Sequence, residues 1–428
     1  MLPTAIIVLL ALLALSIPVA ATLFILAIVL DMWFAPAPLM RALGSQLWDT
    51  STSFILVAIP LFILIGEILL RSGIATKVYE ALDSWLSWLP GGLMHAKIGT
   101  ATLFSATSGS SVATSATVGT IALPQGRRFG YDERFFAGSI AAGGTLGILI
   151  PPSINLIIYG FLSRTSIPQL FVAGIVPGLL LAASFMAIIL VMCLIKPKWG
   201  GERRTATMGA RVRNLQHLLP VFVLFAFIIG SIYAGWATPT EAAAVGTVAS
   251  LGLAWFHGGL SWGMIVQALE GTMRTTAMIM LILIVANFLN FVLASVGLTT
   301  QLINFIGAQE LSAMQTLLVL VVFYIVLGFF IETLSLMIIT IPFVTPLILQ
   351  LGFDPVWFGI LLIVLIEMAL ITPPVGLNLY VVQGVRGRGN LTEVMVGAIP
   401  FAIAMLLMVG LLILFPGLAL FLPELAFR

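Results

Sequence analysis

Charged residues are scarce in this sequence. Asp, Glu, Lys and Arg make up 8% of the 428 residues, against about 25% in soluble globular domains. Because 61% of the residues are hydrophobic, the chain could not cover a water-exposed surface, which excludes an ordinary soluble enzyme or binding domain. A transmembrane helix needs about 20 consecutive apolar residues. The runs that approach or exceed this length are 4–30, 53–70, 170–195, 218–233, 242–256, 277–296 and 394–415. The sequence therefore predicts an all-α polytopic membrane protein.

The sequence also has few cysteines and histidines, and it lacks a phosphate-binding loop motif. The single cysteine, Cys193, excludes an intramolecular disulfide and a cysteine-rich metal site. The three histidines are isolated, so none forms a ligand pair at helical spacing. No G-x-x-x-x-G-K-[ST] motif is present, and uphill transport by this chain would therefore not use its own ATP hydrolysis.

The two halves of the chain repeat the same landmarks at a constant spacing. The equivalent positions are Pro124 with Pro346, Gly130 with Gly352, Asp132 with Asp354, Phe136 with Phe358, and Pro151-Pro152 with Pro373-Pro374. The strings GYD and GFD mark equivalent turns, and ILIPPSINL and LITPPVGLNL mark equivalent breaks. We interpret this as an internal repeat, although Gly and Pro also recur simply because they are common turn residues.

The distribution of positive charge predicts that the repeats are inverted. The first turn, GRRFGYDER, contains three arginines, whereas its mate, residues 347–357, has no Lys or Arg. By the positive-inside rule, the first turn faces the cytoplasm and the second faces away. The basic linker KPKWGGERRTATMGARVR is then cytoplasmic, and only Arg41, Arg164 and Arg428 of the 18 Lys and Arg fall outside. Inverted repeats with paired interruptions are typical of a secondary transporter whose site lies at the membrane midplane.

Each repeat contains a segment that must enter and leave on one side of the membrane. Residues 91–124 and 311–346 offer two helical arms each, and an arm of about 15 residues reaches about 22 Å, less than a hydrocarbon core of about 30 Å. We therefore predict two re-entrant hairpins, with tips near residues 108–111 and 331–333. Such tips must be buried in protein or line a wet cavity.

The first tip is rich in small hydroxyl side chains. Gly109 permits a tight turn, Ser110 and Ser111 can cap the second arm, and the free amides of a helix N-terminus attract an anion. Hydroxyl and carbonyl oxygens also suit a hard cation such as sodium. We assign Ser108, Gly109, Ser110 and Ser111 to the site. The alternative is that small residues only let helices pack closely, which we favour for residues 113–119.

The Pro-Pro pairs predict broken helices at the other wall of the site. Proline lacks an N–H and displaces the preceding residue from helical geometry, so each break frees carbonyls of the kind that coordinate Na⁺ in broken-helix transporters. Pro151 follows a flexible run containing Gly144 and Thr145, and Pro373 follows Thr372. Asn155 and Asn378, just beyond the breaks, either restore backbone hydrogen bonding or reach the ligand.

Acidic residues inside the membrane are functional candidates by default. Glu332, beside Thr333 at the second tip, is either a cation ligand or a helix cap, since its charge would repel an anionic substrate. Glu67 and Glu367 lie within predicted membrane spans. Either carboxyl group is protonated there, or it contacts water where two domains meet. Their roles remain open at the level of sequence.

These landmarks give a domain plan. Residues 1–52 form an N-terminal scaffold span, since residues 1–30 lack the basic start and cleavage site of a signal peptide. Residues 53–195 form the first inverted repeat, with hairpin 91–124 and broken helix 135–161. Residues 196–275 contain the cytoplasmic linker and two connecting spans. Residues 276–428 form the second repeat, with hairpin 311–346 and broken helix 355–383.

Four strings carry a resemblance to a known family: SGSSVATSATVG, AAGGTLGILIPPSINLIIYG, ATPTEAAAVG and ITPPVGLNLY. Over nearly the whole chain the sequence resembles the large membrane subunit of tripartite ATP-independent periplasmic (TRAP) transporters. The resemblance implies an elevator-type, sodium-coupled importer of organic acids in the bacterial inner membrane. It also implies two protein partners, a small membrane subunit of about four helices and a periplasmic binding protein that delivers the substrate. No nucleic-acid partner is expected.

The resemblance also assigns roles to positions. It implies a substrate site between the two tips and sodium sites between each tip and its nearby break. The predicted substrate-binding residues are Ser108, Gly109, Ser110, Ser111, Asn155, Glu332, Thr333 and Asn378. The predicted sodium-binding residues are Ser110, Gly144, Thr145, Pro151, Ser153, Thr372 and Pro373. The second tip, IETLS, matches the family pattern less distinctly.

Two other classes of function compete with this prediction. An intramembrane enzyme with a serine of SGSS as nucleophile needs a base within hydrogen-bond reach, and no histidine occupies a matching position. A channel, or a carrier of the same fold that needs no binding protein, could use the same half-helices. The identity of the carboxylate, the number of sodium ions, the resting conformation and the oligomeric state do not follow from the sequence.

Overall fold

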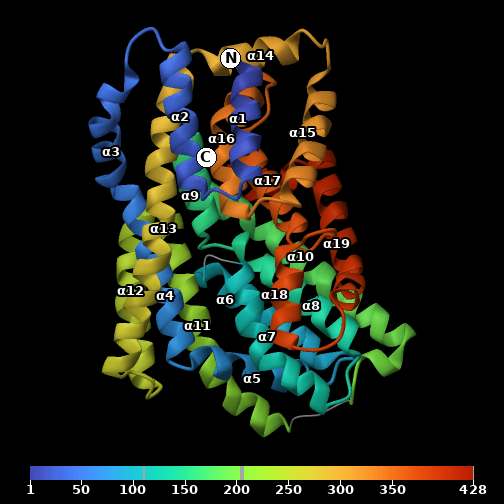
Figure 1. The fold of residues 1–428 in the computed structure, drawn as a ribbon. Coiled ribbons are helices and arrows are strands. Elements are labelled where there is room, and N and C mark those ends of the chain that lie inside the picture. The colour runs from blue at the N-terminus through green and yellow to red at the C-terminus, as the bar shows by residue number, and fades with distance from the viewer. Residues whose placement is uncertain (109–110, 203–206, 428) are drawn as a thin grey trace.

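The fold is entirely helical over the residues described by this computed structural model, which are 1–108, 111–202 and 207–427 (Figure 1). The predicted all-α class is confirmed. Gly109 and Ser110, two of the predicted tip residues, lie outside the described part, as does the side chain of Ser108. By length and composition, six described segments could cross a membrane: Phe54–Arg71, Ile167–Ile195, Met208–Tyr233, Trp262–Ser295, Thr333–Gln350 and Leu391–Leu414.

The first apolar run forms two helices, so the expectation of one continuous span is wrong. Helix α1 (Leu2–Ala14) and helix α2 (Val19–Phe34) lie side by side (Figure 1). Between them, Ser16 has a φ of 56°, which ends a right-handed helix. Pro18 then stands at the N-cap of α2, because proline has no N–H to continue a preceding helix.

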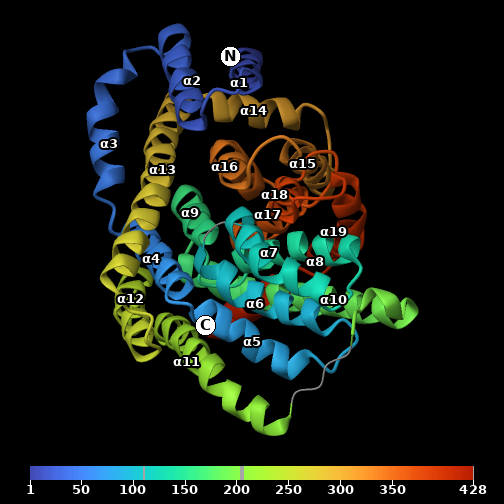
Figure 2. The same ribbon diagram turned by 60° about the horizontal axis from the view of Figure 1, so that its bottom comes forward.

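A layer of long helices forms one side of the molecule. It contains α4 (Ala58–Arg71), α11 (Met208–Tyr233), α12 (Pro239–Phe256) and α13 (Trp262–Ser295), which lie together at the left in Figure 2. The short elements η1 (Leu39–Ala42), α3 (Leu43–Ser51) and η2 (Phe54–Val57) connect α2 to this layer. The Thr238–Glu241 capping box begins α12. We refer to these four long helices as the scaffold layer.

The first repeat region runs from the arm that follows α4 to the short helix that follows α10. It contains the arm α5 (Ile74–Leu86), the helix pair α6 (Gly92–Ser108) and α7 (Ser111–Arg128), and α8 (Glu133–Thr145). After η3 (Leu146–Ile148) and the Pro-Pro break come α9 (Ile154–Ser163), α10 (Ile167–Ile195) and η4 (Pro197–Trp199). Helix α7 continues past Pro124, which lies inside it.

The second repeat region contains elements in the same order. These are the arm α14 (Leu298–Gly307), the pair α15 (Ala313–Gly328) and α16 (Thr333–Gln350), α17 (Pro355–Ala369), and α18 (Leu377–Arg386) beyond the second break. The chain ends in α19 (Leu391–Leu414) and α20 (Gly417–Ala426). The arms α5 and α14 lie at opposite ends of the molecule in Figures 1 and 2.

The GYD and GFD strings form turns with the same local chemistry. Gly130 and Gly352 have φ values of 69° and 80°, which glycine adopts without a steric penalty. Asp132 then caps α8 by accepting a 2.9 Å hydrogen bond from the Phe135 amide. Asp354 caps α17 by accepting a 2.7 Å hydrogen bond from the Val356 amide. The two aspartates therefore begin corresponding helices in the two halves.

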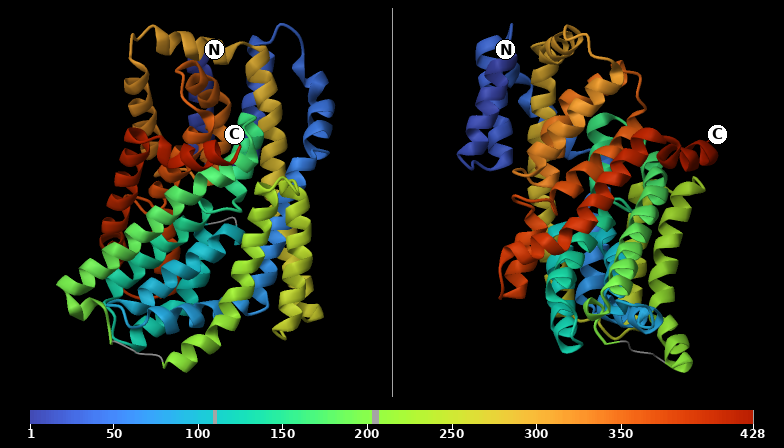
Figure 3. Two further views of the ribbon diagram at one scale, coloured as in Figure 1. Left: turned by 180° about the vertical axis from the view of Figure 1, so that it is seen from behind. Right: turned by 90° about the vertical axis from the view of Figure 1, so that its right-hand side faces the viewer.

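The two halves meet where α8 crosses α19. A Cβ atom added at Gly138 of α8 would overlap the backbone carbonyl of Gly397 in α19. A Cβ atom at Gly397 would in turn overlap the carbonyl of Arg134. These helices therefore touch backbone to backbone, an approach that only glycine allows. Behind them, α10 runs next to α20 (Figure 3).

Candidate functional site

The first residue of α7 is bonded to a buried carboxyl group from the other half of the chain. The Ser111 hydroxyl donates a 2.5 Å hydrogen bond to Oε2 of Glu367 in α17. The Ser111 side chain is 2% exposed and Glu367 is 1% exposed. A carboxyl group in such a place is stable only when hydrogen-bonded, so this bond fixes the start of α7 against α17.

The start of α16 faces the same carboxyl. The hydroxyl of Thr333 lies beside the Glu367 carboxyl, on which Ser111 also converges, and the Glu332 carboxylate is near the same group. Glu332 is the N-cap of α16, and its Oε2 accepts hydrogen bonds from the Ser335 amide at 3.1 Å and the Ser335 hydroxyl at 3.2 Å. The beginnings of α7 and α16 therefore converge on Glu367, which sequence reasoning left without a role.

Oxygen atoms without hydrogen bonds gather at this point. Oε1 of Glu367 and Oγ1 of Thr333 are buried, and neither forms a hydrogen bond of good geometry to a described residue, although the two groups lie beside each other. Leaving a buried polar atom unpaired costs about 1–3 kcal/mol, so such atoms mark a place where a ligand or ion can bind. Hydroxyl, carbonyl and carboxylate oxygens are the donors that hard cations prefer.

The end of α8 forms the adjacent wall. A Cβ atom at Gly144 would overlap Oγ of Ser115 and lie 2.8 Å from the Ser111 carbonyl oxygen, so the absence of a side chain lets α7 touch α8. The buried Ser115 hydroxyl has no hydrogen-bond partner in the described part of the chain. The Thr145 hydroxyl donates a 2.7 Å hydrogen bond to Ala142 O, which leaves its lone pairs as acceptors. The donor set here fits a sodium ion.

The first break is buried along its whole length. Residues 151–160 are all buried, and the peptide bond between Pro151 and Pro152 is cis. Ser153 caps α9, since its hydroxyl accepts from the Leu156 amide at 3.4 Å. Neither amide atom of Asn155, 1% exposed, has a hydrogen-bond partner among the described residues. Asn155 therefore has more unused hydrogen-bonding capacity than Asn378, the other predicted asparagine.

The second break is more open, and it reaches back to the first repeat. Pro374 is exposed and Pro373 half-buried, with a cis bond between them. The Thr372 hydroxyl donates a 2.6 Å bond to Met368 O in its own helix. Nδ2 of Asn378 donates a 3.1 Å bond to Ala141 O in α8, while its buried Oδ1 has no hydrogen-bond partner in the described chain. The Asn378 side chain therefore provides a hydrogen bond to a backbone carbonyl of α8, and its Oδ1 is left free to accept a hydrogen bond.

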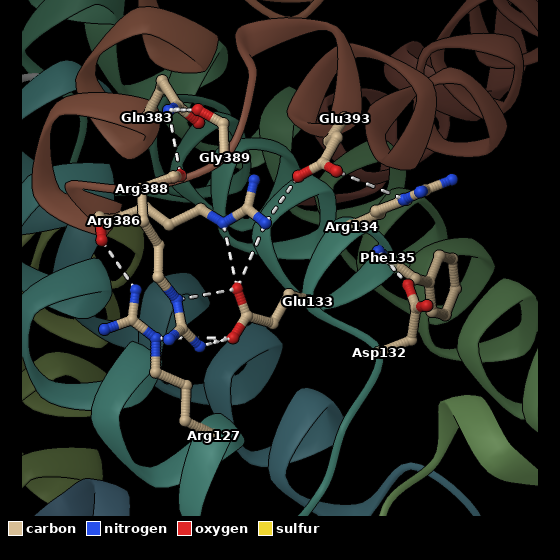
Figure 4. Close-up of polar contacts among 10 residues, drawn as sticks. All are labelled: Arg127, Asp132, Glu133, Arg134, Phe135, Gln383, Arg386, Arg388, Gly389 and Glu393. Atoms are coloured by element: carbon tan, nitrogen blue, oxygen red, sulfur yellow. Dashed lines mark hydrogen bonds and ion pairs between the residues drawn. The ribbon is translucent and has the colours of Figure 1, made fainter.

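A cluster of ion pairs ties the two repeat regions together at the predicted cytoplasmic end. Glu133, at the start of α8, pairs with Arg127, Arg386 and Arg388 (Figure 4). The buried Arg386 also lies 2.6 Å from Glu393 of α19, and Arg127 donates a 2.6 Å hydrogen bond to its carbonyl oxygen. Residues 127–133 and 386–393 lie far apart in the sequence, so only the fold reveals that the two groups form one cluster.

Two further charged residues were missed or left open by sequence reasoning. Glu67 accepts a 2.5 Å hydrogen bond from Nε of Arg71, four residues on, and this helical spacing was available as a signal. Lys97, buried in α6, donates to Phe136 O at 3.1 Å and Ser139 Oγ at 2.9 Å. Its ammonium nitrogen also lies 3.3 Å from the Phe136 ring centre, so Lys97 holds α6 against α8.

Comparisons with known proteins identify the family of this chain. Residues 6–418 match the family described as "Tripartite ATP-independent periplasmic transporter, DctM component". The chain belongs to the DctM family. A C4-dicarboxylate TRAP transporter large permease protein of Pseudomonas aeruginosa is 34% identical over 90% of each chain. The sialic acid TRAP transporter large permease protein of Vibrio cholerae is 32% identical over 89% of each. These DctM-family relatives are permease components of transporters, and this chain is likewise a multi-pass transport protein rather than an enzyme.

A solved structure shares the architecture. The YdaH transporter of Alcanivorax borkumensis superposes with a TM-score of 0.64, covering 94% of this chain and 98% of that one. Because the two sequences are 16% identical, the likeness concerns the fold alone. The DctM-family chain therefore has the general helical architecture of a known membrane transporter.

Proposed function

We propose that this chain is the transport subunit of a sodium-coupled TRAP importer for an organic acid in the bacterial inner membrane. A periplasmic binding protein delivers the acid, and a small membrane subunit of about four helices completes the scaffold. Family membership supports this assignment, and the convergence of α7 and α16 on Glu367 carries it. Two helix N-termini that meet in a buried place offer amides and partial positive charge to a carboxylate.

The charges at this site favour an order of binding. Glu332 and Glu367 are the acidic side chains beside the two tips, and neither forms an ion pair with a Lys or Arg in the described part of the chain. An organic anion alone would be repelled there. Sodium bound near Ser111, Gly144 and Glu367 would offset that repulsion, so sodium binds first and the acid follows. This order makes import depend on the sodium gradient.

We propose that the residues assigned from the sequence act in the same site. Sodium binds between each tip and its nearby break, with oxygens from Ser110, Thr145 and Ser153 on one side and Thr372 on the other. The carboxylate binds between the tips, with Asn155 and Asn378 as donors. The two repeats then move together, as in an elevator, and the Glu133 cluster keeps them aligned during the movement.

Uptake into proteoliposomes tests the proposed function. Vesicles would contain this chain with its small subunit, and the outside solution would hold a binding protein loaded with a labelled organic acid. We expect uptake only when an inward sodium gradient and the binding protein are both present. Uptake that needs neither would instead indicate a channel or a carrier that works without a binding protein.

A further inference from the structure

Three arginines share one carboxylate at the predicted cytoplasmic end of the two repeat regions. Nε of Arg127 lies 3.6 Å from Oε1 of Glu133. Nη2 of Arg386 lies 3.1 Å from Oε2 of the same carboxylate, and Nε of Arg388 donates a 3.3 Å hydrogen bond to that oxygen. Figure 4 shows the guanidinium groups gathered around Glu133. These four residues form the Glu133 cluster.

The Glu133 cluster has more positive charge and more hydrogen-bond donors than its acceptors can balance. Glu393 provides a second carboxylate, 2.6 Å from Arg386, but that carboxylate also faces Arg134. Four guanidinium groups therefore face two carboxylates, and guanidinium groups carry far more N–H donors than so few carboxylate oxygens can accept. Nη1 of the buried Arg386 has no hydrogen-bond partner among the described residues. The cluster is therefore short of an anionic acceptor.

Two of the three guanidinium groups around Glu133 are open to an incoming anion. The Arg388 side chain is 57% exposed and that of Arg127 is 33% exposed, whereas that of Arg386 is 5% exposed. Arg127 and Arg388 both contact Oε1 of Glu133, so their guanidinium groups are adjacent (Figure 4). Adjacent guanidinium groups are well suited to phosphate, because each can donate two parallel hydrogen bonds to its oxygens.

The turn after α18 holds the backbone of Arg388 in place. Gly387 and Gly389 have φ values of 67° and 70°, at which a side chain would be strained. Nε2 of Gln383 donates hydrogen bonds to the carbonyl oxygens of Arg388, at 3.1 Å, and Gly389, at 2.9 Å. A Cβ atom at Gly389 would lie 2.8 Å from the Arg386 guanidinium, so the turn closes onto the cluster. Because this turn is already ordered, an anion that binds Arg388 has little backbone entropy to remove.

We propose that the Glu133 cluster binds a phosphate group at the cytoplasmic surface, with Arg127 and Arg388 as its direct contacts. The bound group offsets the excess positive charge, which Glu133 alone neutralises only in part. Because Arg127 belongs to the first repeat region and Arg388 to the second, the phosphate also links the two regions. An anionic phospholipid headgroup and a free phosphate ion offer the same chemistry. This site is separate from the hairpin tips, so the inference does not depend on sodium coupling.

Thermal unfolding of the purified chain in a neutral detergent tests this binding. Inorganic phosphate replaces chloride at constant ionic strength, since salt alone screens exposed ion pairs. A parallel series adds phosphatidylglycerol and compares it with phosphatidylcholine, whose headgroup has no net charge. A ligand that binds the folded state raises the midpoint. A rise with inorganic phosphate supports a free-phosphate site, and a rise with phosphatidylglycerol alone supports a lipid site. No rise with either probe refutes the proposal.

Three variants test whether the probe binds at this cluster. Arg388→Gln should weaken the apparent affinity for the effective probe roughly tenfold, the value of one lost charge-assisted contact. Arg164→Gln is the matched control and should keep the wild-type affinity, because Arg164 is an exposed arginine at the end of α9, as Arg388 is beyond the end of α18.

Glu133→Gln gives a result that a merely structural cluster would not produce. Glutamine keeps an acceptor oxygen but removes the competing negative charge, so the probe should bind roughly fivefold more tightly, the effect of one unit charge near the surface. This gain is expected even though the variant without a probe is less stable. Unchanged affinity in Arg388→Gln, equal losses in Arg388→Gln and Arg164→Gln, or no gain in Glu133→Gln would overturn the assignment of the site.

Discussion

Adjacent glycines at the end of α8 give a matched test of the candidate site. At Gly144, an added methyl would overlap Oγ of Ser115 and lie 2.8 Å from the Ser111 carbonyl oxygen, so the start of α7 must move. At Gly143, it would lie 3.3 Å from Cδ1 of Ile98 and 3.5 Å from Cβ of Ala101, contacts that small side-chain shifts relieve. Both replacements raise helix propensity equally, so this contribution cancels in the comparison.

The expected difference follows from the cost of overpacking. Inserting a methyl into a packed place costs about 1–3 kcal/mol. If that cost falls on the binding-competent arrangement of α7, its population decreases about 5- to 150-fold. We therefore expect Gly144→Ala to lose sodium-dependent uptake by this factor, with Gly143→Ala within about threefold of the wild type.

The assay is initial uptake at several sodium concentrations, normalised to the amount of folded protein in the membrane. Gly144→Ala should also need more sodium for half-maximal uptake, because the oxygens near Ser111 are displaced. Equal uptake by the two alanine variants, or a Gly144→Ala variant with wild-type sodium dependence, would refute the placement of the sodium site at this contact.

Three further replacements test separate parts of the account. Ser111→Ala removes the hydrogen-bond donor to the buried Glu367 carboxyl, which costs about 1–3 kcal/mol. Uptake should fall sharply in Ser111→Ala, and Ser111→Thr, which keeps a hydroxyl, should retain part of it. An equal loss of uptake in both variants would argue against a role for the hydroxyl. Glu133→Gln leaves the buried Arg386 with one carboxylate partner in place of two, so the thermal midpoint in detergent should drop by an amount equivalent to about 1–3 kcal/mol, and an unchanged midpoint would show that the cluster contributes nothing. Pro151→Ala permits a continuous helix at the break, so uptake measured in vesicles should decrease by roughly tenfold or more while membrane insertion persists; normal uptake would refute a role for the break.

Local chemistry explains which features of the fold can be recognised in the sequence. Asp132 and Asp354 cap helices because an aspartate before a helix bonds the free amides of its first turn. The Pro-Pro pairs interrupt helices because proline has neither the N–H nor the geometry to continue one. The Thr238–Glu241 capping box, which begins α12, follows the same logic. Each of these features depends on a few neighbouring residues, and each is visible without the fold.

Tertiary packing determines what the sequence could not reveal. Ser111 and Glu367 are distant in the chain, and nothing near either residue indicates the other. The same holds for Glu133 with Arg386. Other misses had local signals: Ser16 and Pro18 divide the first apolar run, and Arg71 stands one helical turn from Glu67. Long-range pairing thus accounts for the missed centre of the site, whereas the split of the first run was within reach.

The central claim is that sodium and the organic acid cross together. The most direct measurement is the simultaneous flux of labelled sodium and labelled acid in proteoliposomes containing both membrane subunits and the loaded binding protein. The account predicts that sodium enters only when the acid enters, in a fixed ratio, and that both fluxes decline together in Gly144→Ala. Acid entry at an unchanged rate without sodium, or steady sodium entry without the acid, would contradict coupling at the hairpin site.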